Sequence, residues 1–132
     1  MIDKKTVMVT GGNGFIGTNL VRLLINSKEY LVVNLDALTY AANTLSLADL
    51  DGNQDHVFVK GNIIDSELVA SLFEQYQPVG IFHLAAESHV DRSIVSPEDF
   101  IQTNVVGTYR LLEATRAYYG TLSEEKKREF RF

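Results

Sequence analysis

The stretch TVMVTGGNGFIG, residues 6–17, decides the predicted fold of this chain. Its first part, Thr6–Thr10, is a short apolar run that predicts a buried strand, and residues 15–25 show helical spacing. Between them the glycines are spaced G-x-x-G-x-x-G, at Gly11, Gly14 and Gly17. Such a turn lets a phosphate reach the backbone, and the helix N-terminus offers it free N–H groups. The stretch therefore predicts a phosphate site, with a turn that merely needs positive φ as the simpler alternative.

Outward from this stretch, strand and helix patterns alternate along the whole chain. Further strands are expected at Tyr30–Leu35, His56–Lys60 and Val79–Ala85, and helices from an Asp65 cap to Tyr76, from a Ser96 cap to Tyr119, and over 123–129. Near-continuous apolar strands separated by helices are typical of a parallel sheet covered on both faces. The predicted fold class is α/β, a partial, doubly wound Rossmann-like sheet with strand order 3-2-1-4.

The predicted domain is residues 1–132, taken as the N-terminal part of a dinucleotide-binding Rossmann domain. Residues 130–132 are expected to start a fifth strand, and the later strands and a substrate domain are expected to be missing. Two helices are predicted to carry one apolar side each, because their apolar residues recur at helical intervals. These sides hold Ile16, Leu20, Leu23 and Leu24 in the first helix, and Ile101, Val105, Thr108, Leu112, Thr115 and Tyr119 in the long one.

Composition and charge exclude several function classes. The chain has 132 residues, of which 45% are hydrophobic and 22% charged, as is ordinary for one globular domain. Its net charge of −5 argues against nucleic acid and against an anionic membrane as partners. It has no cysteine and only three scattered histidines, so no metal site is predicted. No apolar run approaches about 18 residues, and no secretory leader is recognised, so the expected location is cytoplasmic.

Asp36 follows the second predicted strand, 22 positions after the middle glycine of the turn. A dinucleotide-binding fold places an acid at about this spacing, where its carboxylate accepts hydrogen bonds from the adenosine ribose. The same carboxylate would repel a 2′-phosphate, and residues 36–43 contain no Lys or Arg to neutralise one. The pattern favours NAD over NADP, and the alternative is a solvated acid at a strand end.

Other candidates lie where the third and fourth predicted strands end, because ligands bind at that edge of open α/β sheets. Small or polar residues stand there, namely Asn62, Ile63, Ala85 and Ala86, followed by the cluster Glu87, Ser88, His89, Asp91 and Arg92. Tight packing explains the alanines almost as well, and a capped surface loop explains the cluster equally well. His83 is predicted to be a satisfied core histidine. Thr103 and Asn104 interrupt the apolar side of the long helix and either bond back to it or point at the dinucleotide.

Four motifs together, TGGNGFIG, LDALTYAAN, HLAAESHVDRSI and FIQTNVVGTYRLLEA, resemble the extended short-chain dehydrogenase/reductase family, and within it the sugar-nucleotide 4,6-dehydratases. The resemblance covers Val7 to about Tyr119. It implies a tightly bound NAD, a dTDP-glucose substrate, and loss of water from the sugar with the hydride returned within one turnover. It also implies a homodimer through the helix at 97–119.

The resemblance also implies roles for individual residues. Gly11, Gly14, Phe15, Ile16 and Gly17 would hold the pyrophosphate; Asp36, Ala37, Leu38 and Thr39 would line the adenosine ribose; and Asn62 and Ile63 would flank adenine. The cofactor channel would be lined by Leu84, Ala85, Ala86, Glu87 and Ser88, with Ser88 also near the sugar nucleotide and Thr103 reaching the cofactor from the long helix.

No catalytic residue is predicted within the chain. The family places its catalytic groups on a Thr-Asp-Glu strand end and a Tyr-x-x-x-Lys pair, and none of the six tyrosines here has Lys four residues later. The expected chain is therefore a cofactor-binding portion without the acid and base of the reaction. Two alternatives stay open: a non-catalytic dinucleotide-binding module, and an epimerase or another dehydratase of the same family.

Overall fold

The computed structural model describes residues 3–39 and 43–132, and residues 40–42 of the LTYAAN motif lie outside them. Four parallel strands form one sheet in the order β3-β2-β1-β4, which confirms the predicted strand order. The strands are β1 (Lys5–Thr10), β2 (Tyr30–Asp36), β3 (His56–Lys60) and β4 (Gly80–His83). Arg131 adds a parallel bridge to Gly80, where a fifth strand was expected to begin.

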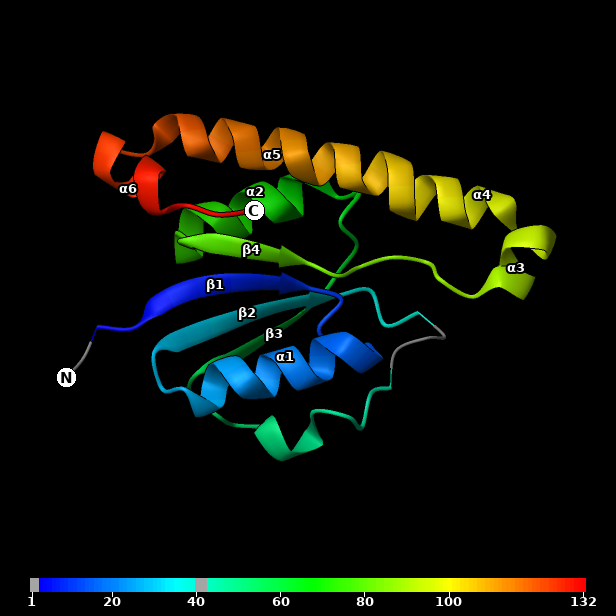
Figure 1. The fold of residues 1–132 in the computed structure, drawn as a ribbon, viewed down its shortest axis with the longest axis horizontal. Coiled ribbons are helices and arrows are strands. Elements are labelled where there is room, and N and C mark those ends of the chain that lie inside the picture. The colour runs from blue at the N-terminus through cyan, green and yellow to red at the C-terminus, as the bar shows by residue number, and fades with distance from the viewer. Residues whose placement is uncertain (1–2, 40–42) are drawn as a thin grey trace.

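Helices cover both faces of the sheet (Figure 1). The elements on one face are α1 (Phe15–Asn26) and the short turn η1 (Ala48–Leu50), and those on the other are α2 (Ser66–Tyr76), α4 (Pro97–Phe100), η2 (Ile101–Gly107), α5 (Thr108–Thr121) and α6 (Glu124–Glu129). A further helix, α3 (Val90–Val95), precedes α4. None of the described helices is long and apolar enough to cross a membrane.

The strands alternate their side chains between two apolar cores. Val9 and Val32 face α1, whereas Met8 and Val33 face α2 and α5, and these side chains are fully buried. Strands that are apolar on both faces are what a parallel sheet covered on both sides requires. The carboxyl ends of the strands therefore remain the open edge where a ligand can reach the backbone.

Local signals set most helix ends at the predicted places. The Asp65 side chain caps α2 by accepting the N–H of Leu68 at 3.0 Å, and the helix ends at Gln77 in a left-handed conformation before Pro78. Ser123 caps α6 through the N–H of Lys126. Ser96 is the N-cap residue of α4 as predicted, followed by Pro97 and by Glu98 in the first turn, but its side chain makes no capping hydrogen bond.

The apolar sides that helical spacing assigns to two helices are only partly buried. In α1, Ile16 and Leu23 are exposed, and the buried residues are Gly17, Thr18, Val21, Leu24 and Ile25. In the long helix, Ile101, Val105, Leu112 and Tyr119 are exposed, whereas Gly107, Leu111 and Thr115 are buried. Both helices carry apolar residues on more than one side, so periodicity alone did not show which side faces the sheet.

The segment after β4 differs from its prediction in two ways. β4 ends at His83 instead of Ala85, because the N–H groups of Leu84 and Ala85 turn to Thr10. The polar cluster that was expected in a loop continues into α3, with His89 as its N-cap. The long helix also contains the π-helical segment η2, which hydropathy did not predict and which is the kind of irregularity often found at functional sites.

Candidate functional site

The glycine turn between β1 and α1 leaves the first turn of the helix open. Gly11 has φ of +72°, which glycine adopts without strain, and its carbonyl accepts the N–H of Gly14 at 3.1 Å. Gly14 is the N-cap of α1, and no side chain caps the helix there. At Gly17 a Cβ would lie 2.1 Å from the Gly11 oxygen, so the helix packs directly on the turn. Open N–H groups and the helix dipole favour an anion at this point.

Asp36 ends β2 in direct contact with the glycine turn. Its carboxylate is buried, and its oxygens accept the N–H of Asn13 at 2.9 Å and the N–H of Leu38 at 2.8 Å. A carboxylate oxygen has two lone pairs, so each oxygen retains the capacity for one more hydrogen bond. Asp36 and the glycine turn thus form one site, although Asp36 lies 22 positions after Gly14. In this site the carboxylate can accept hydrogen bonds from hydroxyl groups beside bound phosphates.

Asn34 supports the turn from the interior of the sheet. It is fully buried, its amide nitrogen donates to Asn13 Oδ1 at 2.9 Å, and a Cβ at Gly12 would lie 2.1 Å from its Oδ1. That Oδ1 atom has no hydrogen-bond partner among the described residues. The contact shows why a polar residue interrupts the apolar strand β2, a signal that sequence reasoning did not use.

The loop after β4 forms the opposite wall of the site. The Thr10 hydroxyl oxygen accepts the N–H groups of Leu84 at 3.1 Å and Ala85 at 3.2 Å. A Cβ at Gly11 would lie 2.7 Å from the Ala85 nitrogen, so the loop touches the glycine turn. These hydrogen bonds hold the carboxyl ends of β1 and β4 together.

Asn104, in the π-helical segment η2, clamps the same loop. Its Oδ1 accepts the N–H of Glu87 at 2.8 Å, and its Nδ2 donates to the Glu87 carbonyl at 2.9 Å. The amide therefore pairs with both backbone polar groups of Glu87, much as a neighbouring strand would. Neither predicted role, back-bonding within the helix or contact with the dinucleotide, describes this arrangement.

A groove runs between these loops at the carboxyl ends of the strands. Twelve of the predicted site residues line it: Gly11, Gly14, Asp36, Ala37, Thr39, Asn62, Ile63, Leu84, Ala85, Ala86, Glu87 and Thr103. Sequence reasoning missed Leu35 and Gly61, which also line it. Both stand at the ends of β2 and β3, so the sheet topology alone could have indicated them.

Five predicted residues are not in the lining of the groove. Phe15 and Ile16 are exposed at the start of α1, Gly17 packs beneath the turn, and Ser88 is exposed at the end of the loop after β4. Leu38 has φ of +54° and directs its N–H to Asp36. Phe15, Ile16 and Gly17 lie in the open first turn of the helix, where backbone N–H groups can meet a phosphate.

Two half-buried histidines do not line the groove. His83 is half-buried, and its ring nitrogens lie 2.7 Å from Thr10 Oγ1 and 3.0 Å from Thr108 Oγ1, as predicted for a satisfied core histidine. Burial lowers the pKa of His83. Burial also lowers the pKa of His56, although the nearby carboxylate of Asp51 opposes that shift.

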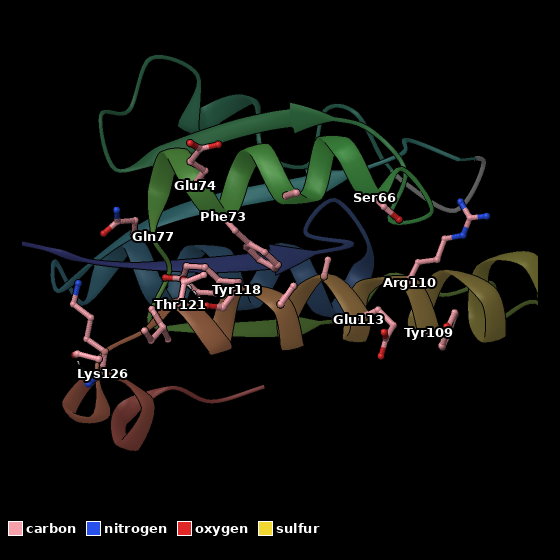
Figure 2. A pocket seen from close by; sticks show the side chains of 15 residues that line it. Ser66, Phe73, Glu74, Gln77, Tyr109, Arg110, Glu113, Tyr118, Thr121 and Lys126 are labelled. Atoms are coloured by element: carbon pink, nitrogen blue, oxygen red, sulfur yellow. Dashed lines mark hydrogen bonds between the residues drawn. The ribbon is translucent and has the colours of Figure 1, made fainter.

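A larger cavity, of about 980 Å³, lies between α2 and α5 on one covered face of the sheet (Figure 2). Phe73 and Tyr118 stack in its floor with ring centroids 5.0 Å apart, and Glu74, Arg110 and Lys126 lie around its rim. None of the predicted site residues lines it. It lacks the open helix N-terminus and the buried acid, so the groove has the features that suit a dinucleotide. No cluster of metal-binding side chains occurs in residues 3–39 and 43–132.

Known proteins share this fold and much of the sequence. Over 126 residues, 96% of this chain, it is 52% identical to a dTDP-glucose 4,6-dehydratase of Haemophilus influenzae, and it spans 37% of that relative's length. A solved dTDP-glucose 4,6-dehydratase of Streptomyces venezuelae, with NAD bound, is 42% identical to this chain, with a TM-score of 0.78. The match covers 86% of this chain and 36% of the Streptomyces chain. A solved UDP-glucose 4-epimerase of Brucella ovis in complex with NAD is 32% identical to this chain, with a TM-score of 0.74. The match covers 86% of this chain and 33% of the epimerase chain.

The chain thus spans about a third of the length of the curated relatives it matches. A family model described as GDP-mannose 4,6 dehydratase matches residues 8–132, from the first core strand through the long helix. This match agrees with the predicted resemblance to sugar-nucleotide 4,6-dehydratases, and the chain belongs to the GDP-mannose 4,6 dehydratase family.

Proposed function

We propose that this chain is the NAD-binding portion of a dTDP-glucose 4,6-dehydratase. The observation that carries the proposal is the contact between Asp36 and the glycine turn, through the N–H of Asn13 at 2.9 Å. The contact brings a buried carboxylate beside an open helix N-terminus at the carboxyl edge of a parallel sheet, which supports a ribose-binding role for Asp36. The 52% identity to a dTDP-glucose 4,6-dehydratase and the NAD in a solved relative support the same assignment.

In this proposal the glycine turn and the groove bind different parts of the cofactor. The backbone from Gly11 to Gly17 holds the pyrophosphate, and Asp36 accepts hydrogen bonds from the adenosine ribose. Asn62 and Ile63 flank the adenine, with the Asn62 side chain held by the N–H of Ile64 at 3.0 Å. The loop 84–88 and Thr103 line the channel toward the nicotinamide, where Ser88 also meets the sugar nucleotide.

Bound NAD would supply reversible hydride acceptance for the dehydration of dTDP-glucose to a 4-keto-6-deoxy sugar. The groups of this chain bind and orient the cofactor, and Ala85 and Ala86 keep the channel wall low enough for the nicotinamide to approach. The acid and base of the reaction are proposed to come from a Tyr-x-x-x-Lys pair and a Thr-Asp-Glu strand end, neither of which occurs in residues 1–132. The 132-residue chain should therefore bind NAD without turnover.

A homodimer is proposed to form through the helix at 97–119. The exposed apolar residues of this helix, Ile101, Val105 and Leu112, lie along it with exposures of 54%, 58% and 45%. An exposed apolar face of this kind favours association with another apolar surface. The cytoplasmic location stays a prediction.

Calorimetric titration with NAD and with NADP tests the cofactor assignment. The chain should bind NAD at least tenfold more tightly than NADP, because the Asp36 carboxylate repels a 2′-phosphate. In Asp36→Ala the preference should shrink, whereas Glu98→Ala, which removes an exposed acid on α4, should leave it unchanged. Equal affinity of the unaltered chain for both dinucleotides would contradict the assignment.

The substrate assignment is tested on the longer protein that carries this chain together with a Tyr-x-x-x-Lys pair. It should convert dTDP-glucose to the 4-keto-6-deoxy sugar and leave UDP-glucose without epimerisation. Epimerisation of UDP-glucose without dehydration would instead favour the epimerase alternative, which the likeness to the Brucella ovis enzyme keeps open.

A further inference from the structure

We propose that His83 is a positioning residue for the cofactor: it orients the Thr10 hydroxyl so that this hydroxyl holds the loop 84–88 against the glycine turn. The proposal rests on the proposed NAD-binding function and adds to it a residue that lies outside the groove. It also predicts that cofactor affinity depends on the protonation state of one histidine.

The first step is the hydrogen-bond capacity of Thr10. Its hydroxyl oxygen accepts the N–H of Ala85 at 3.2 Å and shares the N–H of Leu84, at 3.1 Å, with the Thr10 carbonyl. A hydroxyl has two lone pairs and one hydrogen. With both lone pairs directed at the loop, the hydrogen has to point elsewhere, and His83 Nδ1 is 2.7 Å away.

The second step is the tautomer of His83. Because Nδ1 accepts the hydrogen of Thr10, the ring carries its proton on Nε2, which lies 3.0 Å from the Thr108 hydroxyl of α5. The ring is therefore neutral and bridges β1 and α5. A protonated ring would direct a second N–H at the Thr10 oxygen, whose lone pairs are already occupied, and the loop would lose at least one of its two bonds.

The surroundings of His83 favour the neutral ring. The groups in contact with it are Thr10 from β1, Thr108 from α5 and the ring of Phe132, 6.1 Å between centroids, and these groups are uncharged. Burial is the cause that lowers the pKa of His83. The loop should thus be held near neutral pH and released as the pH falls through the lowered pKa.

Two substitutions separate this role from packing. In His83→Asn the side-chain oxygen can take the place of Nδ1 and still accept from Thr10, while in His83→Leu the acceptor is lost; both variants lose the bond to Thr108. We expect the NAD dissociation constant to rise about tenfold in His83→Leu and to stay within about twofold in His83→Asn, since one or two hydrogen bonds are at stake. Equal losses in the two variants would overturn the proposal.

The pH profile is the second readout. Between pH 8 and 5 the NAD affinity of the unaltered chain should weaken on acidification, and that dependence should vanish in His83→Asn, because the amide does not titrate. His89→Gln, at the exposed N-cap of α3, should keep it. A profile that survives in His83→Asn, or that vanishes in His89→Gln, would overturn the proposal.

Hydrogen exchange of the Ala85 amide tests the positioning without any cofactor. Exchange should be slow in the unaltered chain and in Thr10→Ser, and faster in Thr10→Val and His83→Leu. Unchanged exchange in these last two variants would overturn the role of His83. If the unaltered chain bound no NAD while exchange followed this pattern, the proposed function would fail and the role of His83 in holding the loop would stand.

Discussion

At the scale of single residues, glycines decide whether the turn can form. At Gly17 an added Cβ would meet backbone atoms of Gly11 and Gly12, at 2.1 and 2.7 Å, which cannot move aside as a flexible side chain could. At Gly120, in the last turns of α5, an added Cβ would meet nothing within 4 Å. The two sites provide a matched pair of substitutions.

Gly17→Ala should destabilise the chain by about 1–3 kcal/mol, as overpacking does, and should sharply reduce NAD binding. Gly120→Ala should be neutral or stabilising by up to about 1 kcal/mol, because alanine favours the helix. Urea unfolding followed by circular dichroism measures both. Equal effects of the two substitutions would show that Gly17 has no packing role in the turn.

Two half-buried histidines should make stability depend on pH. The pKa values of His83 and His56 are lowered by burial in the folded chain, so the unfolded chain takes up protons first as the pH falls. The free energy of unfolding should be constant above about pH 7 and should decrease as the pH falls below about 6.5 toward the lowered values.

Urea unfolding at pH 7.5, 6.5 and 5.5 measures this dependence. The decrease should be smaller in His83→Asn and should persist in His89→Gln, whose histidine is exposed. A free energy of unfolding that rises on acidification to pH 5.5 would have the wrong sign for neutral buried rings.

Among the secondary-structure elements, the π-helical segment η2 holds residues that line the groove in place. Asn104 makes two hydrogen bonds to the backbone N–H and C=O of Glu87, and a Cβ at Gly107 would lie 2.8 Å from Ile63, which lines the groove. The segment therefore contacts two walls of the groove at once. Its irregular geometry is consistent with a functional position in the helix.

Asn104→Ala should weaken NAD binding about fivefold to tenfold, because the loop at Glu87 loses two hydrogen bonds. Gln102→Ala changes an exposed neighbour on the same segment and should leave the affinity within about twofold of the original. Titration calorimetry compares them. The clamp would be unimportant if both variants bound NAD equally well.

The sequence predicted some secondary-structure elements more accurately than others. His56–Lys60 was predicted with its observed bounds, because strand alternation and the flanking turns agree. The buried sides of α1 and α5 were not, since Leu23 and Leu112 are as apolar as the residues that do pack on the sheet. In the site, glycine spacing indicated the turn and Asp36, but the contacts of Asn34 and Asn104 depend on where the strands and η2 meet in space.

At the scale of the whole molecule, an apolar face is left uncovered along α3, η2 and α5. Val90, Ile94, Val95, Ile101 and Val105 are each more than half exposed. Exposed apolar side chains on neighbouring helical segments favour association. We expect the 132-residue chain to self-associate at micromolar concentrations.

Sedimentation velocity over a concentration series measures the association. A double substitution, Ile101→Glu with Val105→Glu, should shift the chain to monomer. Leu23→Glu, which changes an exposed apolar residue on α1, should leave the association as it was. A monomer at every concentration would contradict the proposed dimer through the helix at 97–119.

The central claim is that the glycine turn and Asp36 together bind NAD. A crystal structure of the chain with NAD tests it most directly. We predict that the pyrophosphate contacts the backbone of Gly11–Gly17 and that the adenosine ribose hydroxyls lie within hydrogen-bond distance of the Asp36 carboxylate. NAD bound in the cavity between α2 and α5, or bound with its ribose away from Asp36, would contradict the account.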